Sequence, residues 1–205
     1  MIGLIKYPAL FLCVIFLASC EKEFLRPNQY VKWLEDESNG LKVKKILGDF
    51  EFTLQYKPTE YVIFDQYKSD TLQKGTMDEK RKEYDGLQYY TFQIKANGSQ
   101  EIMKADISNE SEYNSRLEYF ISPAQDDIML VENEDTLPCV LYHFERSYGL
   151  SPMNNIVLGF EKSKQSSTAD KLFIYNDQVL GTGPVKLTIQ EKNIQNIPSI
   201  RYEQN

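Results

Sequence analysis

The sequence is poor in the residues on which catalytic and metal sites most often depend. His143 is the only histidine and no serine stands in a Gly-x-Ser-x-Gly turn, so Ser-His-Asp catalysis would rest on that one side chain. A zinc site of His and Cys ligands would also need Cys139, but four residues of regular strand would hold the two about 13 Å apart on one face. We therefore expect no metal ion, no cofactor and no catalytic residue, and we predict that the protein is not an enzyme.

Long apolar runs are equally scarce. The single one, from Leu10 to Ala18, follows Lys6 and ends in small residues. This is the order of a secretory signal peptide, and the run falls short of the 20 or so residues that a membrane-spanning helix needs. The sequence therefore predicts a signal peptide over residues 1–19, removed by cleavage between Ser19 and Cys20.

The end of that segment, Leu17-Ala18-Ser19-Cys20, resembles the lipobox of bacterial lipoproteins. The resemblance implies that Cys20 carries a diacylglycerol and that its new amino group is acylated. A protein held in this way works at a membrane surface without spanning it. The expected location is the outer membrane, with the periplasmic face and the cell surface both left open.

Cysteine is too scarce for a disulfide-stabilised domain, and basic residues are too few for a protein that binds nucleic acid or anionic lipid by charge. Cys13 would leave with the signal peptide and Cys20 would carry lipid, so Cys139 alone remains and no disulfide can form within the mature chain. We expect Cys139 to be a buried, unreactive thiol. The net charge of −7 argues against nucleic acid and against electrostatic docking on anionic lipid.

Alternating apolar and polar residues dominate the remainder. The clearest run is 50–57, and the other predicted strands are 41–47, 87–96, 127–131, 136–145, 156–161, 171–175 and 185–190. Helical patterns are fewer: a turn capped by Asn28, a helix at 60–67, one from the Thr76 capping box to Gly86, and one at 109–120. The expected fold is α+β and mainly antiparallel, a sandwich or bent sheet with two or three short helices. Residues 20–27 would be the lipidated cysteine and a spacer, and residues 28–205 a single domain.

Three stretches in the C-terminal part resemble small uncharacterised lipoproteins of Bacteroidota. They are Thr136–Arg146, with the run Thr-Leu-Pro-Cys-Val-Leu-Tyr-His-Phe-Glu-Arg, Asn155–Phe160, and Lys171–Tyr202. The resemblance implies no assigned chemistry, so no functional residue carries over from it.

Other candidate residues have ordinary structural interpretations. His143 is interpreted as a strand residue bonded to a neighbour such as Glu145. A calcium site could use the carboxylates near residue 130, but their spacing matches no calcium loop, and we expect a solvated hairpin there. These carboxylates are Asp126, Asp127, Glu132, Glu134 and Asp135.

We therefore expect a non-catalytic envelope lipoprotein that binds a protein or glycan partner. Aromatic side chains make effective contacts, and Trp33, Tyr89 and Tyr148 are the candidates for partner contact. One alternative is a carboxylate-dependent envelope hydrolase, which requires a pocket with two converging acids. Another is a carrier of apolar ligands, which requires a closed apolar cavity.

Overall fold

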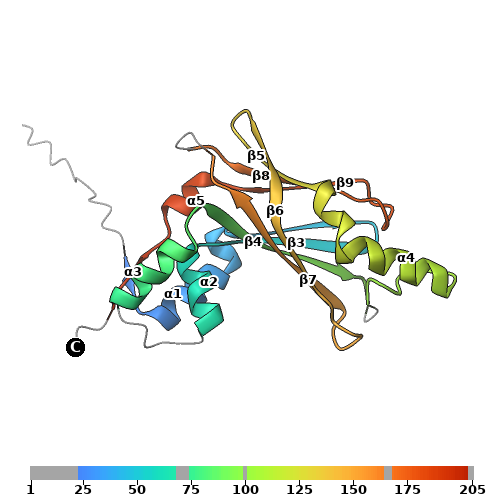
Figure 1. The fold of residues 1–205 in the computed structure, drawn as a ribbon, viewed down its shortest axis with the longest axis horizontal. Coiled ribbons are helices and arrows are strands. Elements are labelled where there is room, and N and C mark those ends of the chain that lie inside the picture. Colours follow the sequence, from blue (N-terminus) through green and yellow to red (C-terminus); the bar gives the residue numbers. More distant parts are fainter. Residues whose placement is uncertain (1–22, 68–73, 99–100, 164–167, 203–205) are drawn as a thin grey trace, which may run out of the picture.

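A computed structural model describes residues 23–67, 74–98, 101–163 and 168–202 (Figure 1). The signal peptide, Ser19 and Cys20 lie outside these residues. The fold is built on an eight-stranded sheet in which every neighbouring pair is antiparallel, in the order β2-β3-β4-β7-β6-β5-β8-β9. The strands are β2 (Lys42–Leu47), β3 (Phe50–Lys57), β4 (Leu87–Ala96), β5 (Ile128–Glu132), β6 (Asp135–Glu145), β7 (Met153–Glu161), β8 (Lys171–Asn176) and β9 (Pro184–Ile189).

The sheet is strongly bent. Its two edge strands, β2 and β9, approach each other, so the sheet nearly closes on itself. This confirms the predicted α+β class with a bent, mainly antiparallel sheet. A second, two-stranded sheet pairs β1 (Phe24–Leu25) in parallel with β10 (Ser199–Ile200), and β1 falls within the segment predicted to be a spacer.

Helices are more numerous than predicted. They are α1 (Pro27–Glu35), α2 (Thr59–Tyr67), α3 (Lys74–Glu83), α4 (Glu110–Ile121) and α5 (Glu191–Gln195), with short 3₁₀ turns at Glu37–Asn39 and Pro123–Asp127. Figure 1 shows α1, α2 and α3 grouped at one end of the sheet and α4 at the other. The sheet therefore has one end that is covered by helices from the first half of the chain.

The helix starts show where local patterns hold. Asn109 accepts a hydrogen bond from the backbone N–H of Glu112, so this predicted cap is confirmed. Asn28 is not a cap, because α1 already begins at Pro27, whose missing N–H costs nothing at a first helical position. Thr76 is likewise inside α3, which starts at Lys74, where a pair with Asp78 supports the first turn.

The interior of the bent sheet is filled with aromatic side chains. Phe92 lies at its centre, with ring centroids 4.8 Å from Phe173, 5.5 Å from Tyr175 and 6.0 Å from Phe52. All four are fully buried. Burying one such side chain contributes about 1.5–3 kcal/mol, so this cluster is a principal source of stability. Cys139, the cysteine among the described residues, is a free thiol and adds no disulfide to it.

A β-bulge changes which residues of β6 face the interior. The pairing of β6 with β7 shifts between Cys139 and Leu141, so Val140 has no partner in the register. Cys139, Tyr142 and Phe144 pair with the buried Phe160, Leu158 and Ile156. The expectation that Cys139 and His143 share one face is therefore wrong, since the bulge reverses the alternation between them.

Candidate functional site

A pocket of about 350 Å³ opens at the helix-covered end of the sheet. We call it the basic pocket, because cationic side chains outnumber carboxylates in its lining. Its charged residues are Lys57, Arg81, Lys82, Lys162, Glu60 and Asp85, and the others are Tyr56, Pro58, Thr59, Leu87, Gln88 and Tyr89. A surplus of positive charge is notable in a chain whose net charge is −7.

Strand pairing assembles this lining from distant segments. Lys57, the last residue of β3, pairs with Tyr89 of β4, and Pro58 then ends the strand so that α2 can begin at Thr59. Leu87, at the start of β4, pairs with Glu161 at the end of β7, which brings Lys162 to the same rim. Three strand ends and the helix α3 thus meet at one place.

Two of the four cations are held by carboxylates. Arg81 donates from Nε to Glu60 at 2.8 Å and from Nη1 to Asp78 at 2.8 Å, and Lys162 contacts Asp85 at 2.5 Å. These pairs are partly exposed, and such pairs contribute little to stability. Their effect is to fix the positions of Arg81 and Lys162, and they occupy both of the carboxylates in the lining.

The other two cations lack such partners. Neither Lys57 nor Lys82 forms an ion pair with any residue that the structure describes. Lys82 is exposed, whereas Lys57 is half-buried with its Nζ 4.8 Å from the centroid of the Tyr61 ring. Burial lowers the pKa of Lys57, and three carboxylates outside the pocket lining, those of Asp65, Glu145 and Glu35, oppose this shift from beyond ion-pair distance. Lys57 is therefore a partly desolvated cation whose described contact is the face of an aromatic ring.

A buried charged cluster lies behind the basic pocket. Gln88, which lines the pocket, donates from Nε2 to Glu132 at 2.5 Å and accepts from the Tyr90 hydroxyl at 3.3 Å. Lys171 Nζ lies 3.2 Å from Glu132 and 3.5 Å from Glu191. Glu132 is only 1% exposed, so the expectation of a solvated hairpin is wrong for this carboxylate. As the last residue of β5 it points into the sheet, where a lysine and an amide satisfy it.

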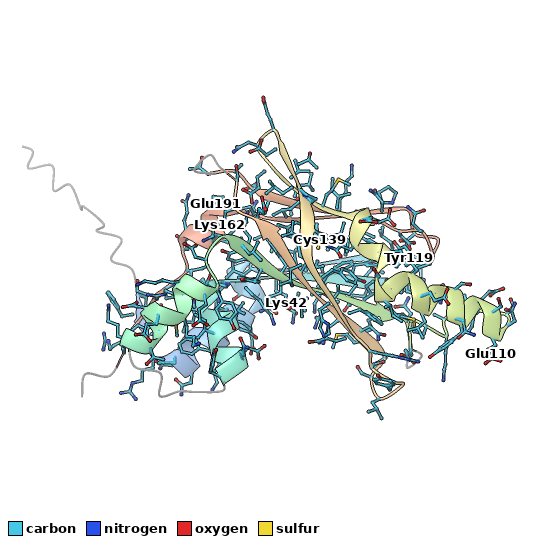
Figure 2. The ribbon with its side chains drawn as sticks, viewed as in Figure 1. Lys42, Glu110, Tyr119, Cys139, Lys162 and Glu191 are labelled. Carbon is cyan, nitrogen blue, oxygen red and sulfur yellow. The ribbon has the colours of Figure 1, made fainter. Side chains whose placement is uncertain are left out.

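Figure 2 places part of this arrangement. Lys162 and Glu191 lie toward the end of the sheet nearest α3, whereas Cys139 lies near its middle. Cys139 is a buried free thiol, and burial raises its pKa to about 11. His143 is exposed. The carboxylate of Glu145, the neighbour predicted to bond it, accepts a hydrogen bond from the side chain of Asn155.

The predicted contact residues are not brought together. Tyr89 lines the basic pocket, with its hydroxyl donating to the Tyr84 carbonyl at 3.2 Å. Trp33 is half-buried against the core, and its carbonyl accepts from Asn39. Tyr148 is 74% exposed in the turn between β6 and β7, with the guanidinium of Arg146 4.8 Å from its ring centroid. Only Tyr89 therefore belongs to the site.

Sequence reasoning missed the cations of the basic pocket. Arg81 and Lys82 appear in a charged helical segment that is typical of a solvated surface, and Lys57 and Lys162 stand alone at strand ends. The sequence feature that could have pointed to Lys57 is Pro58, which follows it. A proline there indicates that the strand ends, but it does not indicate which residues of other segments lie beside Lys57.

A second hollow, of about 570 Å³, lies beside α4 and is lined in part by Arg116. The Arg116 Nη1 group donates to the carbonyls of Ile102 and Ala105, both at 2.6 Å. Backbone acceptors thus already engage this guanidinium. We therefore take the basic pocket as the candidate site.

The residues that the structure describes contain no group of three or more His, Cys, Asp or Glu side chains placed to hold a metal ion. Within the same residues, no helix combines the length and the apolar character that crossing a bilayer requires.

No protein-family model and no curated protein matches this chain. Among solved structures, that of a novel protein of unknown function from Burkholderia pseudomallei K96243 aligns with a TM-score of 0.37 and 11% identity. The alignment covers 85% of this chain and 94% of that one. A likeness at this level carries no argument about function.

Proposed function

We propose that this protein is a lipid-anchored component of the bacterial outer membrane with a non-catalytic binding role. The observation that carries the binding role is the basic pocket. Its carboxylates, Glu60 and Asp85, are both engaged by lining cations, and the other two lining cations, Lys57 and Lys82, form no ion pair within the described residues. This arrangement suits the capture of a ligand better than proton transfer, which needs an acid or base free to reach the substrate.

The anchor rests on the resemblance of Leu17-Ala18-Ser19-Cys20 to a lipobox. Folded structure begins soon after it, because Ser199 donates to the Glu23 carbonyl at 2.8 Å and Arg201 to the Leu25 carbonyl at 2.8 Å. Residues 21–23 can extend about 11 Å at most. A lipid on Cys20 would therefore hold the end of the domain that contains β1 and β10 close to the bilayer.

The basic pocket belongs to that same end. Arg81 donates to the hydroxyl of Tyr202 at 3.4 Å, and Tyr202 follows directly on β10 and Arg201. The proposed anchor would thus keep the pocket near the membrane surface. A ligand held there would belong to the cell envelope.

A carboxylate-dependent envelope hydrolase remains the second candidate, and the buried carboxylates favour it. Glu132 and Glu191 meet on Lys171, and Glu191 Oε2 accepts no hydrogen bond within the described residues. Against this candidate, neither carboxylate lines the basic pocket, where substrate would sit. The aromatic packing around Phe92 weighs against a carrier of apolar ligands.

The anchor is tested by expressing the full chain and its Cys20→Ser variant in a Bacteroidota host supplied with labelled palmitate. We expect the parent protein to be shortened, labelled and recovered with the outer membrane, and the variant to be unlabelled and uncleaved. Cys13→Ser is the matched control, since it changes the same residue type inside the signal segment. A Cys20→Ser product that still carries label in the membrane fraction would refute the anchor.

A further inference from the structure

We propose that the basic pocket binds a sugar that bears a phosphate or carboxylate group, with Lys57 and Lys82 contacting the anionic group. This inference deepens the proposed binding role and names the class of ligand. The anionic sugar could be a free saccharide or part of a lipid headgroup, and the chemistry of recognition is the same for both.

The charge of the lining favours an anionic ligand. With Arg81 and Lys162 already paired to Glu60 and Asp85, the surplus positive charge rests on Lys57 and Lys82. A cation removed from water is normally paired directly with an anion, and Lys57 forms no such ion pair within the described residues, where carboxylates act on it only from a greater distance. An anion in the pocket would be a partner in direct contact and would make charge-assisted hydrogen bonds.

The remaining lining suits a small ring. Tyr56, Pro58, Leu87 and Tyr89 provide aromatic and apolar surface, and Gln88 and Thr59 provide polar groups between them. Ligand pockets combine this mixture of apolar wall and few polar contacts, and they begin at about 300 Å³. The volume of about 350 Å³ is therefore enough for a monosaccharide or a headgroup sugar.

Two cations in the lining are held in place before any ligand arrives. The pairs of Arg81 with Glu60 and Asp78, and of Lys162 with Asp85, fix the rim of the pocket. Pre-organised groups lose less conformational entropy on binding. Lys82, which is exposed, is the contact that must be ordered by the ligand itself.

The test uses the purified full chain in detergent and isothermal titration with glucose 6-phosphate, glucuronic acid and glucose. We expect the two anionic sugars to bind and glucose to bind at least about 10-fold more weakly, since a charge-assisted contact distinguishes them. Raising the salt concentration should weaken binding of the anionic sugars only. Binding of glucose as tight as that of glucose 6-phosphate would overturn the proposal.

Variants locate the binding. Lys57→Met and Lys82→Met should each weaken glucose 6-phosphate binding about 10-fold. Lys186→Met is the matched control, because Lys186 is an exposed lysine of β9 that does not line the pocket. Circular dichroism and the melting temperature establish that each variant is folded. Any of three results would refute the site. They are loss of binding in Lys186→Met alone, unchanged binding in both pocket variants, and no binding of any anionic sugar to the folded parent.

A second arm separates the two sources. Vesicles of phosphatidylcholine mixed with equal parts of phosphatidylinositol, whose headgroup is a phosphate-bearing polyol ring that resembles a sugar phosphate, are added as competitors, against vesicles of phosphatidylcholine alone. If only the vesicles with the inositol lipid compete, and Lys57→Met abolishes this competition, the site binds a lipid headgroup. If neither kind of vesicle competes while the free sugars bind, the site binds a soluble saccharide. Cys20→Ser is expected to bind these sugars as the parent does, so failure of the anchor and failure of the pocket are distinguishable.

Discussion

Replacing Lys171 by methionine removes the cation that two carboxylates share inside the domain. Lys171 is 6% exposed, and its Nζ lies 3.2 Å from Glu132 and 3.5 Å from Glu191. Without it, the contact that Glu132, which is 1% exposed, keeps among the residues described by the structure is the hydrogen bond from Gln88. Breaking one partner out of a buried ion pair costs about 3–5 kcal/mol, because the remaining charge is desolvated and uncompensated.

The loss is measurable by urea and by heat. For a domain of this size about 3–5 kcal/mol corresponds to a fall in melting temperature of about 6–20 °C. Trp33 is the only tryptophan, so its fluorescence reports unfolding near α1, and circular dichroism reports the sheet as an independent probe. The double variant Lys171→Met with Glu132→Leu should recover much of the loss, since it also removes the more deeply buried of the two carboxylates and leaves only Glu191, whose side chain is 14% exposed. A single variant that loses less than about 1 kcal/mol, or a double variant less stable than Lys171→Met, would refute the reasoning.

Two further predictions concern β7 and its partner strand. A Cβ added at Gly159 would lie 2.9 Å from the Cβ of Leu141, so Gly159→Ala should lower the free energy of unfolding in urea by about 1–3 kcal/mol. Gly75 on α3 is the control, because a Cβ added there meets no atom within 4 Å and Gly75→Ala should not destabilise the fold. Equal stability of the two alanine variants would contradict this. Burial raises the pKa of Cys139 to about 11 from 9.0, so the folded protein holds the proton more tightly and this group's contribution to stability falls as pH rises from about 9 to 11. At pH 9 its alkylation by iodoacetamide, followed by peptide mass spectrometry, should be at least about 50-fold slower in the folded chain than in urea, and similar rates would be inconsistent with a buried thiol.

Alternation in the sequence is a strong predictor for strands that bury one face. The predicted ranges 50–57 and 87–96 coincide with β3 and β4, and 136–145 differs from β6 by one residue at its start. The pattern fails where a second layer covers the outer face. Gln55 of β3 is buried and donates to the carbonyl of Leu34, because α1 packs over that side. A polar residue at an alternating position thus indicates the strand but not what covers it.

Short or irregular elements escape this reasoning. β1 and β10 have two residues each and exist only by pairing with one another across the length of the chain. The bulge at Val140 likewise depends on its partner strand, where Gly159 leaves room for the Leu141 side chain. Information of this kind lies in the pairing of segments, and no window of local sequence contains it.

The candidate site shows the same limit in its chemistry. Tyr89 is a candidate for partner contact from the sequence, which stays a prediction, and its position beside Lys57 follows from the register of β3 with β4. The carboxylates near residue 130 were predictable as a cluster, but Glu132 differs from its neighbours by pointing inward to Lys171, which is nearly forty residues away in the chain. Local composition therefore indicates which groups are available and cannot tell which of them are paired.

The basic pocket and the buried cluster are joined by one side chain. Gln88 lines the pocket and donates to Glu132, which Lys171 in turn contacts. The hydrogen bond to Glu132 therefore fixes the Gln88 amide on the side that faces the interior of the domain. A hydrogen-bonded network that is buried in this way is rigid. The rigidity of the pocket floor thus derives from the same charges that stabilise the fold. The contacts that hold Glu132 inside the domain therefore also keep the floor of the basic pocket in place, and Lys82, which is exposed and forms no ion pair within the described residues, is left to adjust to the ligand.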